Sequence, residues 1–131
     1  MLVCPTSFIA PQRPLLAYDG SQRAAAAMHA AAEFCVSVNL PLTVLTVAKD
    51  GEVGERISKD AQTYLGAYKL ASHCEAQTGH APEQIVATLT DGHFDVLFIG
   101  AYGHSRILEM VLGSTTEYVL RHSPCPVFLN R

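Results

Sequence analysis

Short runs of apolar and β-branched residues alternate along this chain with longer stretches in which apolar residues recur at helical spacing. Each short run is typical of a strand buried in a sheet. The predicted strands cover residues 15–18, 42–47, 72–78, 96–99 and 127–129. The predicted helices cover residues 21–38, about 57–71, 82–91 and about 115–123. Because helical crossovers join parallel strands, the pattern predicts an α/β fold with a five-stranded parallel sheet flanked by helices.

Capping residues and helix breakers indicate where these helices begin. Ser21 is a candidate N-cap for the first helix, and Ser114 or Thr115 for the last. Pro82 fits the first position of the third helix, where its missing N–H costs nothing. Residues 50–54, Asp-Gly-Glu-Val-Gly, read as a polar loop, and the segment around them fits no regular pattern.

Composition narrows the class of protein. The chain has 131 residues, enough for one packed domain, and 49% of them are apolar while 16% are charged. This balance excludes disorder and suggests that part of the surface is covered, most simply by a second subunit. The net charge of −3, without a Lys/Arg block, argues against nucleic-acid and anionic-membrane binding. No apolar run reaches the roughly 18 residues of a membrane span, and no signal peptide is evident, so a cytoplasmic location is expected.

The four cysteines are scattered, without a Cys-x-x-Cys pair. Three of them lie in apolar or strand-like runs, so we expect buried free thiols rather than disulfides, as in a reducing compartment. Cys35 shares a small-residue face of the first helix with Ala25, Met28 and Ala32, which would let helix and sheet approach closely. The six histidines show no metal-ligand spacing, and no metal site of the protein's own is assigned.

The most informative stretch follows the strand at 96–99. It contains Gly100, Gly103 and Gly113, and Gly113 is followed by Ser114 and Thr115. A strand, a glycine turn and a helix N-terminus together can hold an anion, because free N–H groups and the helix dipole converge there. The stretch is neither a P-loop, since it lacks Gly-Lys-Ser/Thr, nor a dinucleotide fingerprint, since it lacks Gly-x-Gly. Taken singly, each glycine could also be an ordinary turn residue.

Taken whole, the spacing Gly-x2-Gly-x9-Gly-Ser resembles the ATP-binding signature of the universal stress protein family. The flanks resemble the family too, with Asp-Val-Leu-Phe-Ile-Gly before it and Leu-Arg-His-Ser-Pro-Cys-Pro-Val-Phe-Leu after it. The resemblance covers roughly residues 14–131 and leaves residues 1–13 as an arm or linker remnant. It implies an adenine nucleotide alpha hydrolase-like domain with strand order 3-2-1-4-5, which binds ATP with Mg²⁺ and forms dimers.

In such a sheet, ligands bind beyond the carboxyl ends of the strands, where the chain direction switches. Asp19, Val47 and Gly100 end the first, second and fourth predicted strands, so they should meet at one edge. Asp19 would bind ribose hydroxyls or, indirectly, Mg²⁺, because its charge repels phosphate; its alternative role is that of a turn residue. The remaining predicted nucleotide contacts are Ala17, Tyr18, Gly103, His104, Arg106, Gly113, Ser114 and Thr115.

These candidates have different assigned roles. Val47 corresponds to the family's adenine position. The backbone N–H groups around Gly103, Gly113, Ser114 and Thr115 would hold the phosphates. His104 stands where the family frequently has arginine, which weakens the cationic contact to phosphate unless Arg106 substitutes.

The same residues constrain the function. No catalytic base can be defended from spacing, so the expected function is that of an ATP-binding stress-response or regulatory protein with at most slow hydrolysis. A nucleotide-independent dimeric interaction module and a weak ATPase remain as alternatives.

The two ends of the chain suggest interactions with other domains. The apolar segment 126–130 is expected to lie at a sheet edge and to pair with its symmetry mate in a homodimer. Residues 2–5, Leu-Val-Cys-Pro, look like another short strand. They could be the remnant of a preceding domain in a tandem protein, or an ordinary N-terminal arm.

Overall fold

The computed structural model describes residues 2–3, 10–101 and 113–130. Three predicted site residues, Gly103, His104 and Arg106, and one cysteine, Cys4, lie outside the described residues. The elements run in the order β1 (Leu2–Val3), β2 (Pro14–Ala17), α1 (Gln22–Val38), β3 (Leu42–Ala48), α2 (Gly51–Leu65), β4 (Ser72–Thr78), α3 (Ala81–Asp91), β5 (Val96–Gly100), α4 (Ser114–His122) and β6 (Val127–Asn130).

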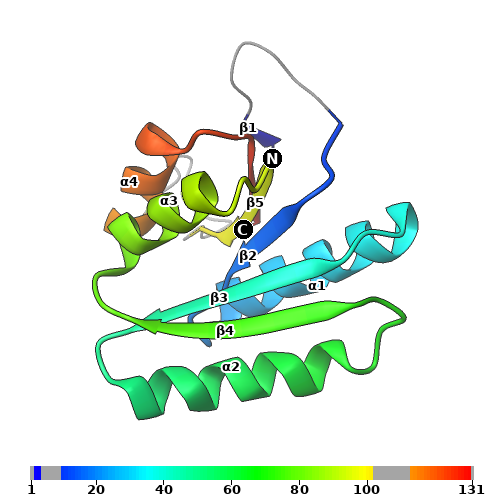
Figure 1. The fold of residues 1–131 in the computed structure, drawn as a ribbon, viewed down its shortest axis with the longest axis horizontal. Helices are drawn as coiled ribbons and strands as arrows, with labels where there is room; N and C mark the ends of the chain where they lie inside the picture. The colour runs from blue at the N-terminus through cyan, green and yellow to red at the C-terminus, as the bar shows by residue number, and fades with distance from the viewer. Residues whose placement is uncertain (1, 4–9, 102–112, 131) are drawn as a thin grey trace, which may run out of the picture.

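The strands form one sheet in the order β1-β6-β5-β2-β3-β4 (Figure 1). The five strands from β2 to β6 are parallel, and their order is the predicted 3-2-1-4-5. The fold class is therefore confirmed. A sixth strand, β1, adds to the prediction: it pairs antiparallel with β6, with Leu2 opposite Phe128 and Val3 opposite Val127. The edge formed by β6, expected to be open, is thus partly paired within the chain.

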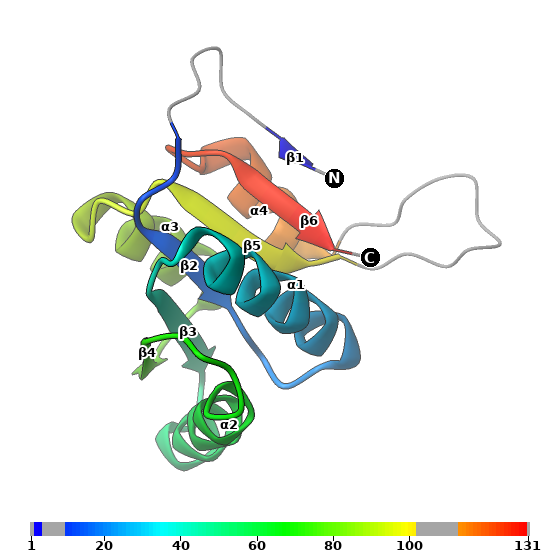
Figure 2. The same cartoon turned by 90° about the vertical axis from the view of Figure 1, so that its right-hand side faces the viewer.

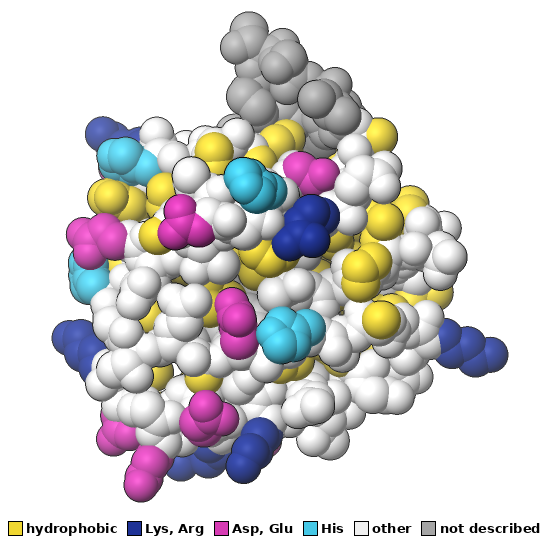
Figure 3. All heavy atoms as spheres, viewed as in Figure 1, with side chains coloured by type: hydrophobic (Ala, Val, Ile, Leu, Met, Phe, Trp, Pro, Cys, Tyr) yellow, Lys and Arg dark blue, Asp and Glu magenta, His cyan; other side chains and the backbone are white. Residues whose placement is uncertain are grey.

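Helices cover both faces of the sheet, α1 and α2 on one side and α3 and α4 on the other (Figure 2). Alternation along the strands divides the core accordingly. Leu16 and Val44 pack toward α1 and α2, whereas Leu15 and Leu45 pack toward α3 and α4. On the side of the molecule seen in Figure 3, acidic and basic side chains are interspersed and do not form a patch of one sign.

The small residues of α1 bring this helix close to the sheet. The Ser21 hydroxyl accepts a hydrogen bond from the Ala24 N–H at 3.2 Å, which confirms the predicted N-cap. The buried face is shifted from the predicted one, because Ala25 is half-buried and its neighbours Ala24 and Ala27 are fully packed. The buried residues of the helix are Ala24, Ala27, Met28, Ala31, Ala32 and Cys35.

The segment predicted as a polar loop is the start of α2, so that prediction was wrong. Asp50 is the N-cap, and its carboxylate accepts hydrogen bonds from the N–H groups of Glu52 and Val53. Gly54 is buried in the first turns, where an added Cβ would lie 3.3 Å from the Cβ of Ala48. Glycine is a poor helix former, but here it lets the helix pack directly on β3. The helix also ends earlier than expected, at Leu65.

The three described cysteines are free thiols, as expected. Cys35 and Cys125 are buried, and Cys74 is half-buried. Burial raises the pKa of the Cys35 thiol to about 11, because desolvation disfavours the thiolate. This thiol is therefore protonated and inert at neutral pH.

Candidate functional site

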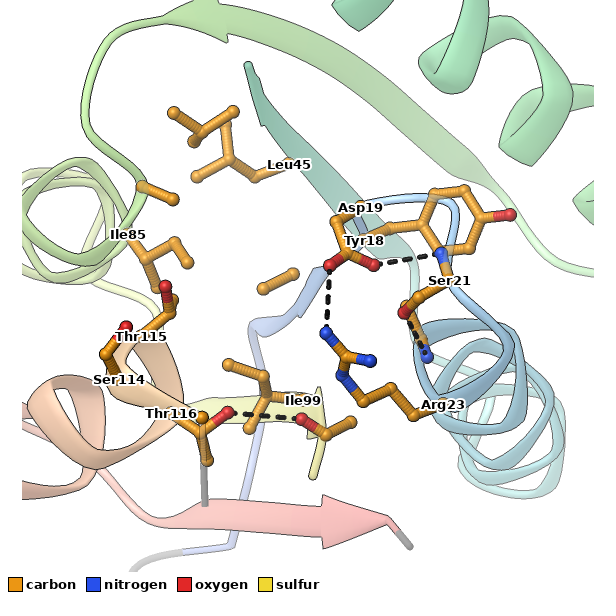
Figure 4. Close-up of a pocket in the computed structure, with 16 residues that line it drawn as sticks. Tyr18, Asp19, Ser21, Arg23, Leu45, Ile85, Ile99, Ser114, Thr115 and Thr116 are labelled. Carbon is orange, nitrogen blue, oxygen red and sulfur yellow. Dashed lines mark hydrogen bonds and ion pairs between the residues drawn. The ribbon is translucent and has the colours of Figure 1, made fainter. Parts of the chain in front are cut away.

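A pocket of about 250 Å³ lies at the carboxyl ends of the parallel strands, between the first turns of α1 and α4 (Figure 4). This is the switch point of the sheet, since the chain leaves the neighbouring strands β2 and β5 in opposite directions there. The volume is near the lower end of the range for small-molecule sites. The structure brings to this pocket every predicted site residue that it describes: Ala17, Tyr18, Asp19, Val47, Gly100, Gly113, Ser114 and Thr115.

One end of the pocket is apolar. Its wall is formed by Leu45 and Val47 of β3, Ala81 and Ile85 of α3, and Ile99 of β5. Of these residues, only Val47 was predicted. Ala81 and Ile85 could have been found from topology, because a helix that follows a parallel strand begins at the carboxyl edge of the sheet. Leu45 and Ile99 belong to the strands that end near Val47 and Gly100, and this was the available signal for them.

The opposite wall is polar and comes from the turn between β2 and α1. The Asp19 carboxylate accepts a hydrogen bond from the Ser21 N–H at 3.0 Å. It also lies 3.8 Å from the Arg23 guanidinium, one turn later. Asp19 is 57% exposed and Arg23 30%, so the pair is accessible from the pocket mouth. Arg23 was missed in the sequence, where its position four residues after Asp19 was the available signal.

The first turn of α4 contributes backbone N–H groups. Its N-cap is Gly113, with φ −65° and ψ 157°, and among the described residues no side chain forms a capping hydrogen bond with this helix. The prediction of Ser114 or Thr115 as N-cap was therefore wrong: both residues lie inside the first turn. The first intrahelical bond runs from the Glu117 N–H to the Gly113 carbonyl at 2.9 Å. The N–H groups before it have no partner within the helix, and the positive end of the helix dipole lies there.

Gly100 holds the two helix starts close together. An added Cβ at this residue would lie 2.5 Å from the Arg23 carbonyl oxygen. On the α4 side, the buried Thr116 hydroxyl donates to the Gly100 carbonyl at 3.3 Å. The glycine is therefore required by the close approach of α1.

Tyr18 lines the pocket and also packs against the core. Its half-buried ring packs with the core cluster between the sheet and helices α1 and α2. Burial raises the pKa of its hydroxyl, and the negative charges of Asp60 and Asp19 raise it further.

Within the described ranges, no group of three or more His, Cys, Asp or Glu side chains could hold a metal ion. Of the helices in those ranges, none combines the length and apolar character needed to cross a membrane.

Comparisons with known proteins agree with this architecture. The model of the universal stress protein family matches residues 12–131. A universal stress protein of Synechocystis sp. is 36% identical over 99% of this chain, and the chain spans 46% of that relative's length. A solved universal stress protein from Archaeoglobus fulgidus is 29% identical with a TM-score of 0.76, covering 92% of this chain and 44% of its own. The UspA structure from Lactobacillus plantarum is 24% identical with a TM-score of 0.75, covering 94% of this chain and all of its own.

Several structures of the same fold were solved with an adenine nucleotide. They include a universal stress protein with cAMP, one from Arabidopsis thaliana with AMP and one from Archaeoglobus fulgidus with dAMP. Their identities to this chain are 20%, 16% and 17%, so they show the shared fold.

Proposed function

Because the chain belongs to the universal stress protein family, we propose that it is a regulatory protein of the stress response that binds an adenine nucleotide in the pocket between α1 and α4. The observation that carries the proposal is the α4 N-terminus, which lines that pocket and has no side-chain cap from the part of the chain that the structure describes. Helix N-termini of this kind bind phosphate through their N–H groups and dipole. The adenine nucleotides bound by proteins of the same fold support the choice of ligand.

The pocket walls fit the parts of a nucleotide. The apolar wall around Leu45, Val47 and Ile85 suits the base, the first turn of α4 suits the phosphates, and Asp19 suits the ribose hydroxyls. Of the two roles expected for Asp19, we favour the ribose contact, because the Arg23 guanidinium lies 3.8 Å from this carboxylate and would repel a Mg²⁺ bound there. ATP with Mg²⁺ stays a prediction from the sequence, and slow hydrolysis is not part of the proposal.

Calorimetric titration tests the proposal. AMP and ATP are titrated into the native chain and into Gly113→Val, each with Mg²⁺ and with a chelator. The native chain should bind nucleotide, and the variant should lose at least tenfold in affinity because the branched side chain obstructs the phosphate position. The backbone of Gly113, at φ −65° and ψ 157°, accepts valine without strain, so the variant should fold.

Gly51→Val is the matched control. Gly51 is exposed at the start of α2 and does not line the pocket, and its added Cβ would have only an ordinary contact with Thr78 at 3.7 Å. This variant should bind like the native chain. Failure of folded native protein to bind AMP or ATP would overturn the proposal, and the nucleotide-independent interaction module would replace it. Tighter ATP binding with Mg²⁺ than with chelator would restore Mg²⁺ to the site.

Dimerisation through residues 126–130 is part of the same proposal. The apolar edge of β6 supports it, but β1 already pairs with Val127 and Phe128. A homodimer through this edge therefore requires β1 to leave it. Light scattering should show a larger dimer fraction for a chain lacking residues 1–9 than for the full chain. If both chains were monomeric at micromolar concentration, the dimer would be contradicted.

A further inference from the structure

We propose that Arg23 binds a phosphate group of the nucleotide, and that Asp19 holds its guanidinium near the pocket until the nucleotide arrives. The proposal rests on the proposed function and assigns the cationic phosphate contact to a residue of α1. The sequence had suggested Arg106 for this role.

The position of Arg23 supports the assignment. In Figure 4, Arg23 and Asp19 lie on one side of the pocket, and Ser114 and Thr115 of α4 lie on the other. A phosphate bound at the α4 N-terminus would occupy the space between them. The guanidinium is planar and carries five donors, so it can bind phosphate with two parallel hydrogen bonds.

The backbone of Arg23 is held firmly at this place. Its carbonyl oxygen packs so closely on Gly100 that an added Cβ would lie 2.5 Å away. The same glycine accepts the hydrogen bond of Thr116 from the α4 side at 3.3 Å. The first turns of α1 and α4 are therefore both held against Gly100 at the end of β5, and the Arg23 side chain extends from this tightly packed backbone.

An anionic ligand needs a positive charge in this pocket to offset the Asp19 carboxylate. Among its described lining residues, Asp19 and Arg23 are the ones with charged side chains. Without Arg23, the Asp19 carboxylate would repel an incoming phosphate. The distance of 3.8 Å and the partial exposure of both side chains make the ion pair with Asp19 weak, so this contact by itself would not keep the guanidinium from a phosphate.

The test compares two ligands that differ by one phosphate. Adenosine and AMP are titrated into the native chain, Arg23→Ala and Arg23→Lys by calorimetry in the presence of a chelator. Arg23→Ala should weaken AMP binding by about 10- to 100-fold, the range for lost hydrogen bonds to a charged group. Adenosine binding should change by less than about threefold. Arg23→Lys should recover part of the AMP affinity, because it keeps the charge without the planar donor pair.

Arg121→Ala is the matched control. Arg121 forms an ion pair with Glu117 at 2.9 Å with the same four-residue spacing, and it does not line the pocket. This variant should keep the native affinities, while circular dichroism confirms that all variants are folded. Unchanged AMP binding in Arg23→Ala would overturn the proposal for Arg23 and leave the nucleotide site intact. An equal loss for adenosine and AMP would overturn it as well, since Arg23 would then only shape the pocket. A native chain that binds neither AMP nor ATP would overturn the proposed function and this assignment together.

Discussion

The first turns of α1 and α4 reach the same point of the fold but begin differently. In α1, the Ser21 hydroxyl satisfies the Ala24 N–H within the chain. In α4, the N-cap is Gly113, and no side chain occupies the corresponding position. A capped helix start stabilises the fold, whereas an uncapped one leaves its N–H groups to a ligand. This difference is the basis of the proposals that the α4 N-terminus binds the phosphate and that Arg23 of α1 contacts it.

The largest effect should come from separating the two helix starts. In Gly100→Ala, the new Cβ would lie within 2.5 Å of the Arg23 backbone, which cannot move away as a flexible side chain could. Overpacking of this kind should lower the free energy of unfolding by about 3 kcal/mol. Urea denaturation measures it. Gly51→Ala, at an exposed position with room for a Cβ, is the control and should be neutral or slightly stabilising. Native stability in Gly100→Ala would show that α1 can shift away from β5.

The next largest effect should come from giving α4 a side-chain cap of the kind that α1 has. Gly113→Asp adds a side-chain acceptor for the first N–H groups of α4 and a negative charge at the positive end of its dipole. Without ligand, this variant should have a free energy of unfolding that is higher by a few tenths of a kcal/mol, as measured by thermal denaturation. AMP affinity should fall about tenfold, equivalent to about 1.4 kcal/mol, because the carboxylate takes the place of phosphate. Unchanged affinity would mean that the α4 N-terminus does not bind the anion.

Removing the N-cap of α1 should lower the free energy of unfolding by about 1 kcal/mol. Ser21→Ala leaves the Ala24 N–H without its acceptor at 3.2 Å. Ser21→Asp should restore most of the stability, since aspartate is an equally good N-cap. Chemical denaturation of the native chain and the two variants measures their free energies of unfolding. If both variants unfolded like the native chain, the hydroxyl would not be the stabilising cap of α1.

The smallest effects should come from two buried threonines. Thr116→Val removes the 3.3 Å hydrogen bond to Gly100 and should cost about 0.5–1 kcal/mol. The hydroxyl of Thr46, on β3, is also buried but has no hydrogen-bond partner among the described residues. Thr46→Val should therefore be neutral or stabilising. Thermal unfolding of both variants tests this contrast. The prediction would be wrong if both substitutions changed the free energy of unfolding in the same direction.

Several features were predictable because they depend on local sequence. The spacing of apolar runs set the parallel strands, and Ser21 marked the start of α1. The glycine spacing and the strand ends predicted a ligand site at one edge of the sheet. The structure brings Asp19, Val47 and Gly100 to one pocket there.

The errors arose where tertiary packing overrode local preference. Two glycines suggested a loop at 50–54, but Gly54 is helical because it packs against Ala48 of the sheet. Two hydroxyl residues suggested the cap of α4, but the chain enters the helix one residue earlier, at Gly113.

The sequence by itself determined the class of fold and the edge of the sheet where a ligand could bind, because strand periodicity and glycine spacing are local properties. Only the tertiary structure decided that Arg23, Ile85 and Ile99 also line the pocket at that edge. The pairing of β1 with β6 joins opposite ends of the chain, and the approach of Arg23 to the pocket depends on the packing of α1 against Gly100. Contacts between residues so far apart in sequence depend on the packed core, and no local pattern encodes them.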